Sequence, residues 1–397
     1  MSSEETKPVK LPIPLDAVPE ELRPRVQDSA PKPLRLALAK AALPVDPGQL
    51  LIVLAYLAQN EDEEIAAAAH ESARELPEQF VRATLQDRNT DPSVLHYYCC
   101  YFAHDERYVE TLLVNASTPD EAFVYMAGEL DQPQWLDMIS FNQVRFLRTP
   151  KIIEAIFYNP ATKMSAVSRM LETGARNGLE LGHIPGFREV QATILGEDEL
   201  KKKRDAGELT AQEFDELMDV QSEGDGLDDD GFLELLREAT EEVDASRIGI
   251  ETEDEDEKVP LWRAISTMKT SQKVRLAILG NAAARKILIR DPKKAVCLAV
   301  LRSPRLTDKE IAFFATQKAL SEDVIRMIAK NREWTRHYST KVALVKNPKT
   351  PTQQSMWFLK SLHAADLKTL AKDRDVPGVV AKTAKRMMDQ KMSGRKR

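Results

Sequence analysis

Cysteine and long apolar segments are both scarce in this chain of 397 residues. The three cysteines, Cys99, Cys100 and Cys297, are too few for a disulfide framework and are typical of a reducing compartment. No run of about 18 or more apolar residues occurs, which argues against a membrane span. The first residues lack the basic flank and apolar stretch of a secretion signal. We therefore expect a cytoplasmic protein without a membrane span.

The sequence motifs of common catalytic sites are also missing. The segment "ILGNAAARK" has one glycine and no Gly-Lys-Ser/Thr, so it does not predict a phosphate-binding loop. No Gly-x-Gly-x-x-Gly, Gly-x-Ser-x-Gly or His-Glu-x-x-His motif occurs. A base-processing site would need a carboxylate in an aromatic-lined basic groove, and nothing singles out Asp366, Asp373 or Asp375 for that role. We predict a protein that is not an enzyme and binds no cofactor.

Strand-like alternation is nearly absent, whereas apolar residues recur at helical spacing through two long regions. The expected fold is all-α, with two blocks of helical repeats separated by an acidic, partly disordered linker. The predicted segments are a Pro-rich disordered lead-in (1–33), an N-terminal repeat domain (34–190), the linker (191–258), a basic C-terminal repeat domain (259–390) and a basic tail (391–397).

One turn pattern interrupts the helical regions repeatedly. In "LLVNASTPDEAFVYMA", from Leu112, we expect Asn115 to end a helix in the left-handed conformation. Thr118 should then cap the next helix, with Pro119 at its first position. Similar turns occur at Asn159, and at Ser303 and Asn347 in the basic half, where Thr350 and Pro351 take the places of Thr118 and Pro119. Each pair of turns, Asn115 with Asn159 and Ser303 with Asn347, is separated by 44 residues.

A spacing near 44 residues falls in the range of about 40–47 residues typical of HEAT and armadillo units. The phrases "NPKTP", "SPRLT" and "NREW" resemble those of bacterial HEAT-like or leucine-rich-variant repeat proteins of uncharacterised function. The resemblance implies stacked helices with a curved binding surface, and no particular activity.

Residues 197–257 contain 25 acidic and 6 basic side chains, a composition typical of a solvated linker. Within them, "LKKKRDAGELTAQEFDELMDV" predicts a helix that ends at Gly207 and a second helix capped by Thr210 and Glu213. This part, about 197–220, resembles a SHOCT-type helical hairpin, which implies self-association or docking. The loop "GLDDDGFLELLR" fits an EF-hand poorly, because Gly226 and Arg237 occupy positions that need acidic ligands.

The segment "LHYYCCYFAH" is the strongest candidate for metal binding. If it is helical throughout, His96, Cys100 and His104 lie on one face, with Cys99 beside His96. Zinc normally takes four ligands, and no second Cys/His pair accompanies them elsewhere in the chain. An aromatic core helix with buried cysteines explains the segment better, so we predict no metal site.

Charge is distributed very unevenly. Residues 261–397 contain 31 Lys and Arg against 10 Asp and Glu, although the whole chain has a net charge of −7. Basic groups beside aromatic rings suit phosphate contacts and base stacking. The candidate residues for an anionic partner are Lys330, Arg332, Trp334, Arg336, Tyr338, Lys341, Lys346, Lys349, Lys382, Lys385 and Arg386.

Two functions follow from these patterns. The first is a non-enzymatic scaffold that presents helical repeats to protein partners whose identity the sequence does not reveal. The alternative is a nucleic-acid-binding module that uses the basic C-terminal repeats. In the alternative, the acidic residues 197–257 could fold back on residues 261–397 and compete with the nucleic acid, because adjacent segments of opposite charge meet at high effective concentration.

Overall fold

The computed structural model describes residues 11–221, 226–240, 249–250, 259–373 and 375–393. This described part is all-α, apart from a short antiparallel pairing of β1 (Gly249–Ile250) with β2 (Val259–Pro260). None of its helices has the length and apolar character needed to cross a membrane. The chain divides into two compact units, Met1–Leu179 and Glu180–Arg397, and each is described separately. This division lies eleven residues before the predicted domain end at residue 190.

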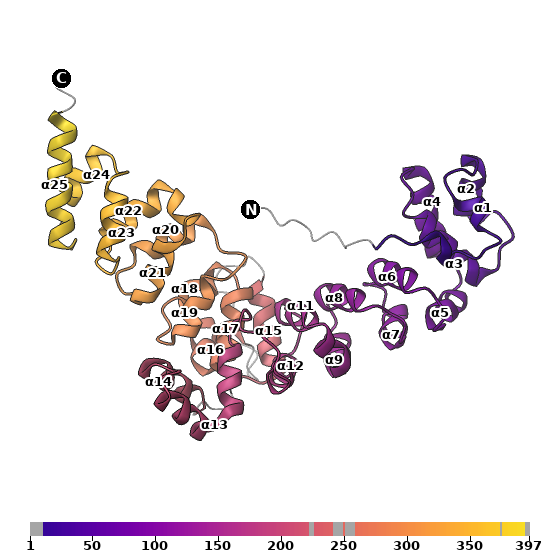
Figure 1. Cartoon of the computed structure of the whole chain (residues 1–397), viewed down its shortest axis with the longest axis horizontal. Coiled ribbons are helices and arrows are strands. Elements are labelled where there is room, and N and C mark those ends of the chain that lie inside the picture. The colour runs from indigo at the N-terminus through magenta and orange to yellow at the C-terminus, as the bar shows by residue number, and fades with distance from the viewer. Residues whose placement is uncertain (1–10, 222–225, 241–248, 251–258, 374, 394–397) are drawn as a thin grey trace. The chain divides into compact units, whose positions relative to one another are not determined.

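The first unit is built from short helices, most of them between 8 and 13 residues long. Figure 1 shows them in chain order. Their bounds are η1 (Leu15–Ala17), α1 (Arg23–Val26), α2 (Lys32–Ala39), α3 (Pro47–Leu57), α4 (Glu63–Glu75), α5 (Glu78–Gln86), α6 (Pro92–Tyr101), α7 (Glu106–Val114), α8 (Asp120–Glu129), α9 (Pro133–Phe141), α10 (Gln143–Arg148), α11 (Lys151–Tyr158) and α12 (Met164–Arg176).

Residues 11–33 are packed against the first helices, which differs from the predicted disordered lead-in. Val18, Leu22 and Val26, which lie at the end of η1 and on either side of the start of α1, are all buried. The backbone of Ile13 donates a hydrogen bond to Oε1 of Gln59 at 3.0 Å. The prolines of this segment therefore shape turns and helix starts in a packed region. Residues 1–10 of the predicted lead-in lie outside the described residues.

From α5 onward the helices of the first unit form two rows. One row contains α5, α7, α9 and α12, and the other contains α6, α8 and α11 (Figure 1). Neighbours within each row are in contact, and the two rows contact each other through the pairs α6 with α7, α8 with α9, α11 with α9 and α11 with α12. The apolar side chains of both rows, such as Leu112, Phe123 and Ile156, are buried between them. No single helix could bury its own apolar stripe, so packing between the rows supplies the core.

The turn at Asn115 connects two neighbouring helices of one row, α7 and α5, through hydrogen bonds. Asn115 has an extended backbone (φ −65°, ψ 121°), so the predicted left-handed conformation is wrong. Its Nδ2 donates to the carbonyl oxygen of Leu85, in the last turn of α5, at 2.7 Å and to that of Asp87, the C-cap residue of α5, at 3.1 Å. Its Oδ1 accepts from the backbone of Ser117 at 2.9 Å. One amide therefore satisfies backbone groups of two helices.

The residues after Asn115 also differ from the prediction. Thr118 does not cap α8, because its Oγ1 donates back to the carbonyl oxygen of Leu112 at 2.7 Å. The N-cap residue of α8 is Pro119, and Pro351 holds the same place before its helix. Thr350 likewise donates back, to the carbonyl oxygen of Leu344 at 2.5 Å. In this turn the threonine closes the preceding helix.

The same arrangement recurs at Asn159 and Asn347, both of which are buried with extended backbones. Asn159 donates to carbonyl oxygens 29 to 32 residues earlier, and Asn347 to carbonyl oxygens 30 and 32 residues earlier. Asn115 ends α7 and Asn159 ends α11, which lie in different rows. The 44-residue spacing thus relates turns of different rows. Neighbours within a row are linked by hydrogen bonds across about 30 residues.

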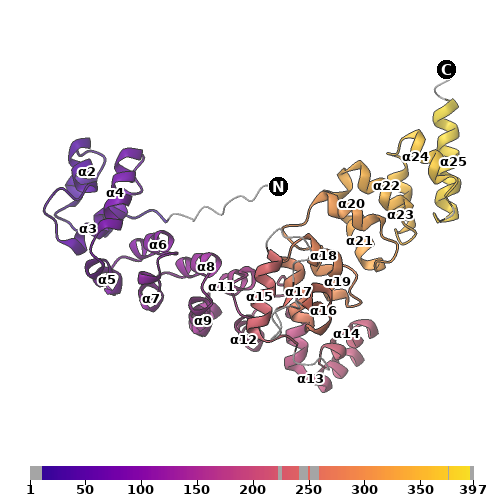
Figure 2. The ribbon, with the colours of Figure 1, turned by 180° about the vertical axis from the view of Figure 1, so that it is seen from behind.

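The second unit begins with a hairpin and continues as another series of short helices (Figure 2). Its elements are α13 (Phe187–Asp205), α14 (Ala211–Gln221), α15 (Asp229–Thr240), β1, β2, α16 (Leu261–Thr267), α17 (Thr270–Leu279), α18 (Ala282–Leu288), α19 (Lys294–Val300), α20 (Asp308–Thr316), α21 (Glu322–Lys330), η2 (Trp334–Arg336), α22 (Tyr338–Lys346), α23 (Thr352–Leu359), α24 (Ala364–Leu370) and α25 (Gly378–Ser393).

Helix α15 is part of the helical stack, so residues 229–240 are not the solvated linker that the sequence predicted. Phe232, Leu235 and Leu236 are fully buried, and α15 packs against α17. The backbone of Asn281 donates to the carbonyl oxygen of Ala239 at 2.6 Å, which joins the end of α17 to the end of α15. Gly231 lies inside this helix, which excludes an EF-hand loop here.

The predicted hairpin is present between α13 and α14. Gly207 has φ +76°, and Thr210 and Glu213 form a reciprocal capping box at 3.0 Å and 3.2 Å. Phe214 packs on Ala192 and Leu200. Local capping rules therefore predicted this turn correctly. The remaining linker residues 222–225, 241–248 and 251–258, and the last tail residues 394–397, lie outside the described residues.

Candidate interaction surfaces

The four residues considered as metal ligands, His96, Cys99, Cys100 and His104, do not form one group. Helix α6 ends at Tyr101, so His104 lies beyond it on a different turn of the chain and is exposed. Cys100 Sγ lies 3.8 Å from His96 Nε2, while Cys99 is fully buried. Burial raises the pKa of both thiols, that of Cys100 to about 12, which disfavours the thiolate that zinc requires. In the described part of the chain, no three His, Cys, Asp or Glu side chains are grouped to hold a metal ion.

The aromatic residues of α6 have structural partners. Tyr98 donates its hydroxyl to the carbonyl oxygen of Leu51 at 2.7 Å, and Tyr101 donates to the carbonyl oxygen of His70 at 2.6 Å. Tyr97 contacts the His70 ring nitrogen at 2.9 Å. These bonds tie α6 to α3 and α4, and burial raises the pKa of each phenol. The segment is an aromatic helix packed in the core, which is the interpretation that the sequence favoured.

The three aspartates considered for base processing are also placed by the structure. Asp366 accepts a hydrogen bond from the hydroxyl of Tyr338. Asp373 accepts from the backbone of Asp375, and Asp375 pairs with Lys318. Each aspartate thus has a partner within the chain: a tyrosine hydroxyl for Asp366, a backbone amide for Asp373 and a lysine for Asp375.

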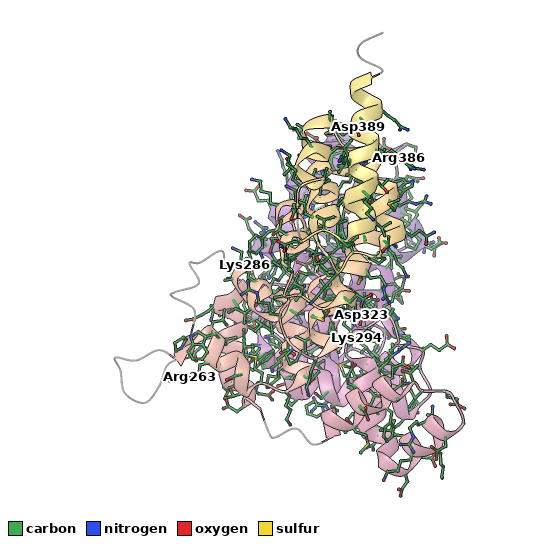
Figure 3. The ribbon with its side chains drawn as sticks, turned by 90° about the vertical axis from the view of Figure 1, so that its left-hand side faces the viewer. Arg263, Lys286, Lys294, Asp323, Arg386 and Asp389 are labelled. Carbon is green, nitrogen blue, oxygen red and sulfur yellow. The ribbon has the colours of Figure 1, made fainter. Side chains whose placement is uncertain are left out.

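The residues predicted to bind an anionic partner do not form one surface. Lys330, Arg332 and Arg336 are exposed around η2, at the turn between α21 and α22. Trp334 is half-buried in that turn. Lys341 lies within α22, whereas Lys346 and Lys349 lie at its other end. Lys382, Lys385 and Arg386 lie on α25, where Figure 3 labels Arg386 and Asp389.

Two of these residues have structural roles. Lys349 donates to the carbonyl oxygens of Ala319 and Leu320, at 3.4 Å and 2.5 Å, and so closes the preceding turn. The Tyr338 ring lies 4.6 Å from that of His363, and its hydroxyl accepts from the backbone of His363 at 3.0 Å. Neither residue is available for stacking or phosphate binding without losing these contacts.

Other basic residues of the second unit are paired. Arg285 is buried and makes a bidentate ion pair with Glu310, at 2.9 Å and 3.0 Å. Lys294 pairs with Asp323 at 3.2 Å, and both side chains are labelled in Figure 3. Arg275 is fully buried, and burial lowers its pKa to about 9. The positive charge of this half is therefore partly used to hold helices together.

An apolar groove in the first unit was not anticipated from the sequence. It has a volume of about 530 Å³ and lies at the ends of α7 and α9. Val114 is 65% exposed, Phe141 66% and Val144 75%. The Arg169 guanidinium lies 4.1 Å from the centre of the Phe141 ring and supports it from one side. The groove is lined by Leu113, Val114, Phe123, Met138, Phe141, Asn142, Gln143 and Val144.

The groove residues occupy a repeated position. Val114 is the last residue of α7 and Phe141 the last residue of α9, and an asparagine follows each of them. These helices are neighbours in one row, so the two side chains project at the same edge. In the sequence, the groove is indicated only by an apolar residue directly before Asn115 and another before Asn142. Val114 and Phe141 become neighbours because α7 and α9 pack side by side in one row.

Comparison of the chain with protein-family models, with curated proteins and with solved structures gives no match. The HEAT-like and SHOCT-like resemblances therefore rest on the residues quoted for them.

Proposed function

We propose that this protein is a non-enzymatic scaffold of the helical-repeat (α-solenoid) type that binds protein partners. Two rows of short helices, joined by recurring asparagine turns, support this proposal. Repeats of this kind stack in one dimension and display an extended surface to partners. The step of about 30 residues within a row is shorter than that of HEAT units, so the architecture is HEAT-like in its stacking and not in its repeat length.

The apolar groove at the ends of α7 and α9 is the observation that carries the proposal. Val114, Phe141 and Val144 together expose apolar surface that a folded chain normally buries. Fully burying a side chain of this kind contributes about 1.5–3 kcal/mol. A partner segment that inserts two or three apolar side chains there would gain most of its binding free energy from this contact.

Photo-crosslinking in the native cell tests the scaffold directly. A photoreactive residue in place of Val144 should yield discrete protein adducts of the full chain. The matched control replaces Glu129, which is the exposed last residue of α8 in the other row. Adducts at Val144 and none at Glu129 support the proposal. Equal patterns at both positions, or none at Val144, would refute the groove as a protein-binding site.

A further inference from the structure

In the second unit, three alternate turns of the chain, those after α19, α21 and α23, lie along one edge. The turn after α19 meets the turn after α21, because His337 Nε2 lies 3.1 Å from a carboxylate oxygen of Asp308. The turn after α21 meets the turn after α23 through Tyr338 and His363. The same edge continues to α15, where Arg305 donates to the carbonyl oxygen of Thr240 at 2.8 Å.

Exposed cations occupy this edge at the interval of the repeat. Arg302 lies two residues after the end of α19, Lys330 ends α21 and Lys360 directly follows α23. These residues are 28 and 30 residues apart, which matches the step within a row. Arg305, Arg332 and Arg336 lie in the same turns. We call the six the basic edge: Arg302, Arg305, Lys330, Arg332, Arg336 and Lys360, all of them exposed.

None of the six makes an ion pair with any part of the chain that the structure describes. Three carboxylates lie nearby: Asp308 faces His337, Asp366 is bonded to Tyr338, and Glu333 is exposed. The turns at the other ends of the same helices differ. There Lys318 pairs with Asp375, and Arg290 contacts Gln317. Among the described residues, this edge therefore presents six exposed cations without an ion pair, placed on turns that contact one another.

An exposed aromatic ring accompanies the basic edge. Trp357 lies in the last turn of α23, three residues before Lys360, and is 62% exposed. It contacts Phe358 edge-on at 5.3 Å, which leaves most of the ring accessible. A row of cations with an exposed tryptophan fits a phosphate backbone whose bases are free to stack. An acidic polypeptide would use the cations and would have no planar base to place on the indole.

We propose that the basic edge binds single-stranded nucleic acid, with Arg302, Lys330 and Lys360 contacting phosphates and Trp357 stacking on a base. The axes of packed helices lie about 8–10 Å apart, so we expect cations on neighbouring turns of this edge to be spaced by a similar interval. Phosphates one or two nucleotides apart on an extended strand match that interval. This site lies in the second unit and is independent of the apolar groove, so the two proposals can fail separately.

Fluorescence anisotropy with the full chain and a labelled 20-nucleotide single strand, as RNA and as DNA, tests the proposal. The triple substitution Arg302→Glu, Lys330→Glu and Lys360→Glu should weaken binding more than tenfold. It should also reduce the slope of log K against log salt by about 2, because about 0.7 counterions are released per single-strand phosphate contact. Trp357→Ala should weaken binding about tenfold, the effect expected for one lost base stack.

The matched control carries the same charge change away from the edge: Lys286→Glu, Lys346→Glu and Lys372→Glu. It should keep most of the affinity, and circular dichroism should show that both triple variants remain folded. Equal losses in the two triple variants would mean that only net charge matters and would overturn the site. Equally tight binding of polyglutamate or of duplex DNA, with no effect of Trp357→Ala, would overturn the single-stranded assignment.

Discussion

Replacing Asn347 with alanine should destabilise the second unit far more than replacing Asn331, although both asparagines end a helix. Asn347 is 1% exposed, and its Nδ2 donates to the carbonyl oxygens of Ala315 at 2.9 Å and Gln317 at 3.2 Å. Its Oδ1 accepts from the backbone of Lys349 at 3.0 Å. Asn331 accepts from Glu333 and Trp334 within its own turn.

The magnitude follows from the groups left without partners. A buried carbonyl that loses its donor costs about 1–3 kcal/mol. Asn347→Ala removes the donor to two carbonyls and the acceptor for one backbone amide, so we expect a loss of about 2–4 kcal/mol in the free energy of unfolding. Asn331→Ala breaks contacts only within its own half-exposed turn, and we expect about 1 kcal/mol or less.

Urea titration followed by circular dichroism measures both losses, and hydrogen exchange at the amide of Lys349 reports the turn itself. Asn347→Asp adds a second check. The new carboxylate would face two carbonyl oxygens, so its pKa should be raised in the folded state. The destabilisation should then be smallest at low pH, where the carboxyl is protonated, and should grow as the pH rises through the folded pKa. Losses of equal size for Asn347→Ala and Asn331→Ala would refute the inter-helix role.

Three further predictions follow from buried groups. The pKa of Asp120 is lowered from 3.8 to about 2 by hydrogen bonds from Arg148, Thr149 and Arg145. About 2 kcal/mol of stability should therefore be present above pH 4 and lost between pH 4 and 2 in acid unfolding. Asp120→Asn should remove this pH dependence, and an acid transition unchanged by the substitution would contradict the prediction. Phe232→Ala should cost about 3–5 kcal/mol in urea titration and expose α15 to protease, whereas a solvated linker would show neither effect. Native Cys99 and Cys100 should react with a thiol reagent far more slowly than in urea, and fast native labelling would show that α6 is not packed as described.

Local sequence rules predicted much of the secondary structure. The capping box at Thr210 and Glu213 and the turn at Gly207 follow from side chains within a few residues of one another. The all-α fold follows similarly from apolar spacing. The rules failed where distant packing decides: α15 was read as linker because acidic residues surround it, yet its apolar face, which includes Phe232, is buried against α17.

The candidate surfaces were less predictable. The sequence indicated a basic half, but it did not separate exposed cations from those that hold turns, such as Lys349 and Arg285. The apolar groove had only the weak signal of Val114 and Phe141 before their asparagines. Exposure depends on which helices are neighbours, and that is a property of the rows.

The sequence by itself determined the all-α character and some helix ends, such as the capping box at Thr210 and Glu213, because caps and apolar spacing act over one or two turns. Only the tertiary structure decided which turns are equivalent. The side-chain amides of Asn115, Asn159 and Asn347 donate to carbonyls about 30 residues earlier, so the 44-residue spacing in the sequence joins turns that do not pack as neighbours of one row. The physical reason is that a buried N–H donor must find an acceptor. The carbonyl oxygens at the end of a packed neighbouring helix lack intrahelical partners, so they accept this bond whatever their distance along the chain.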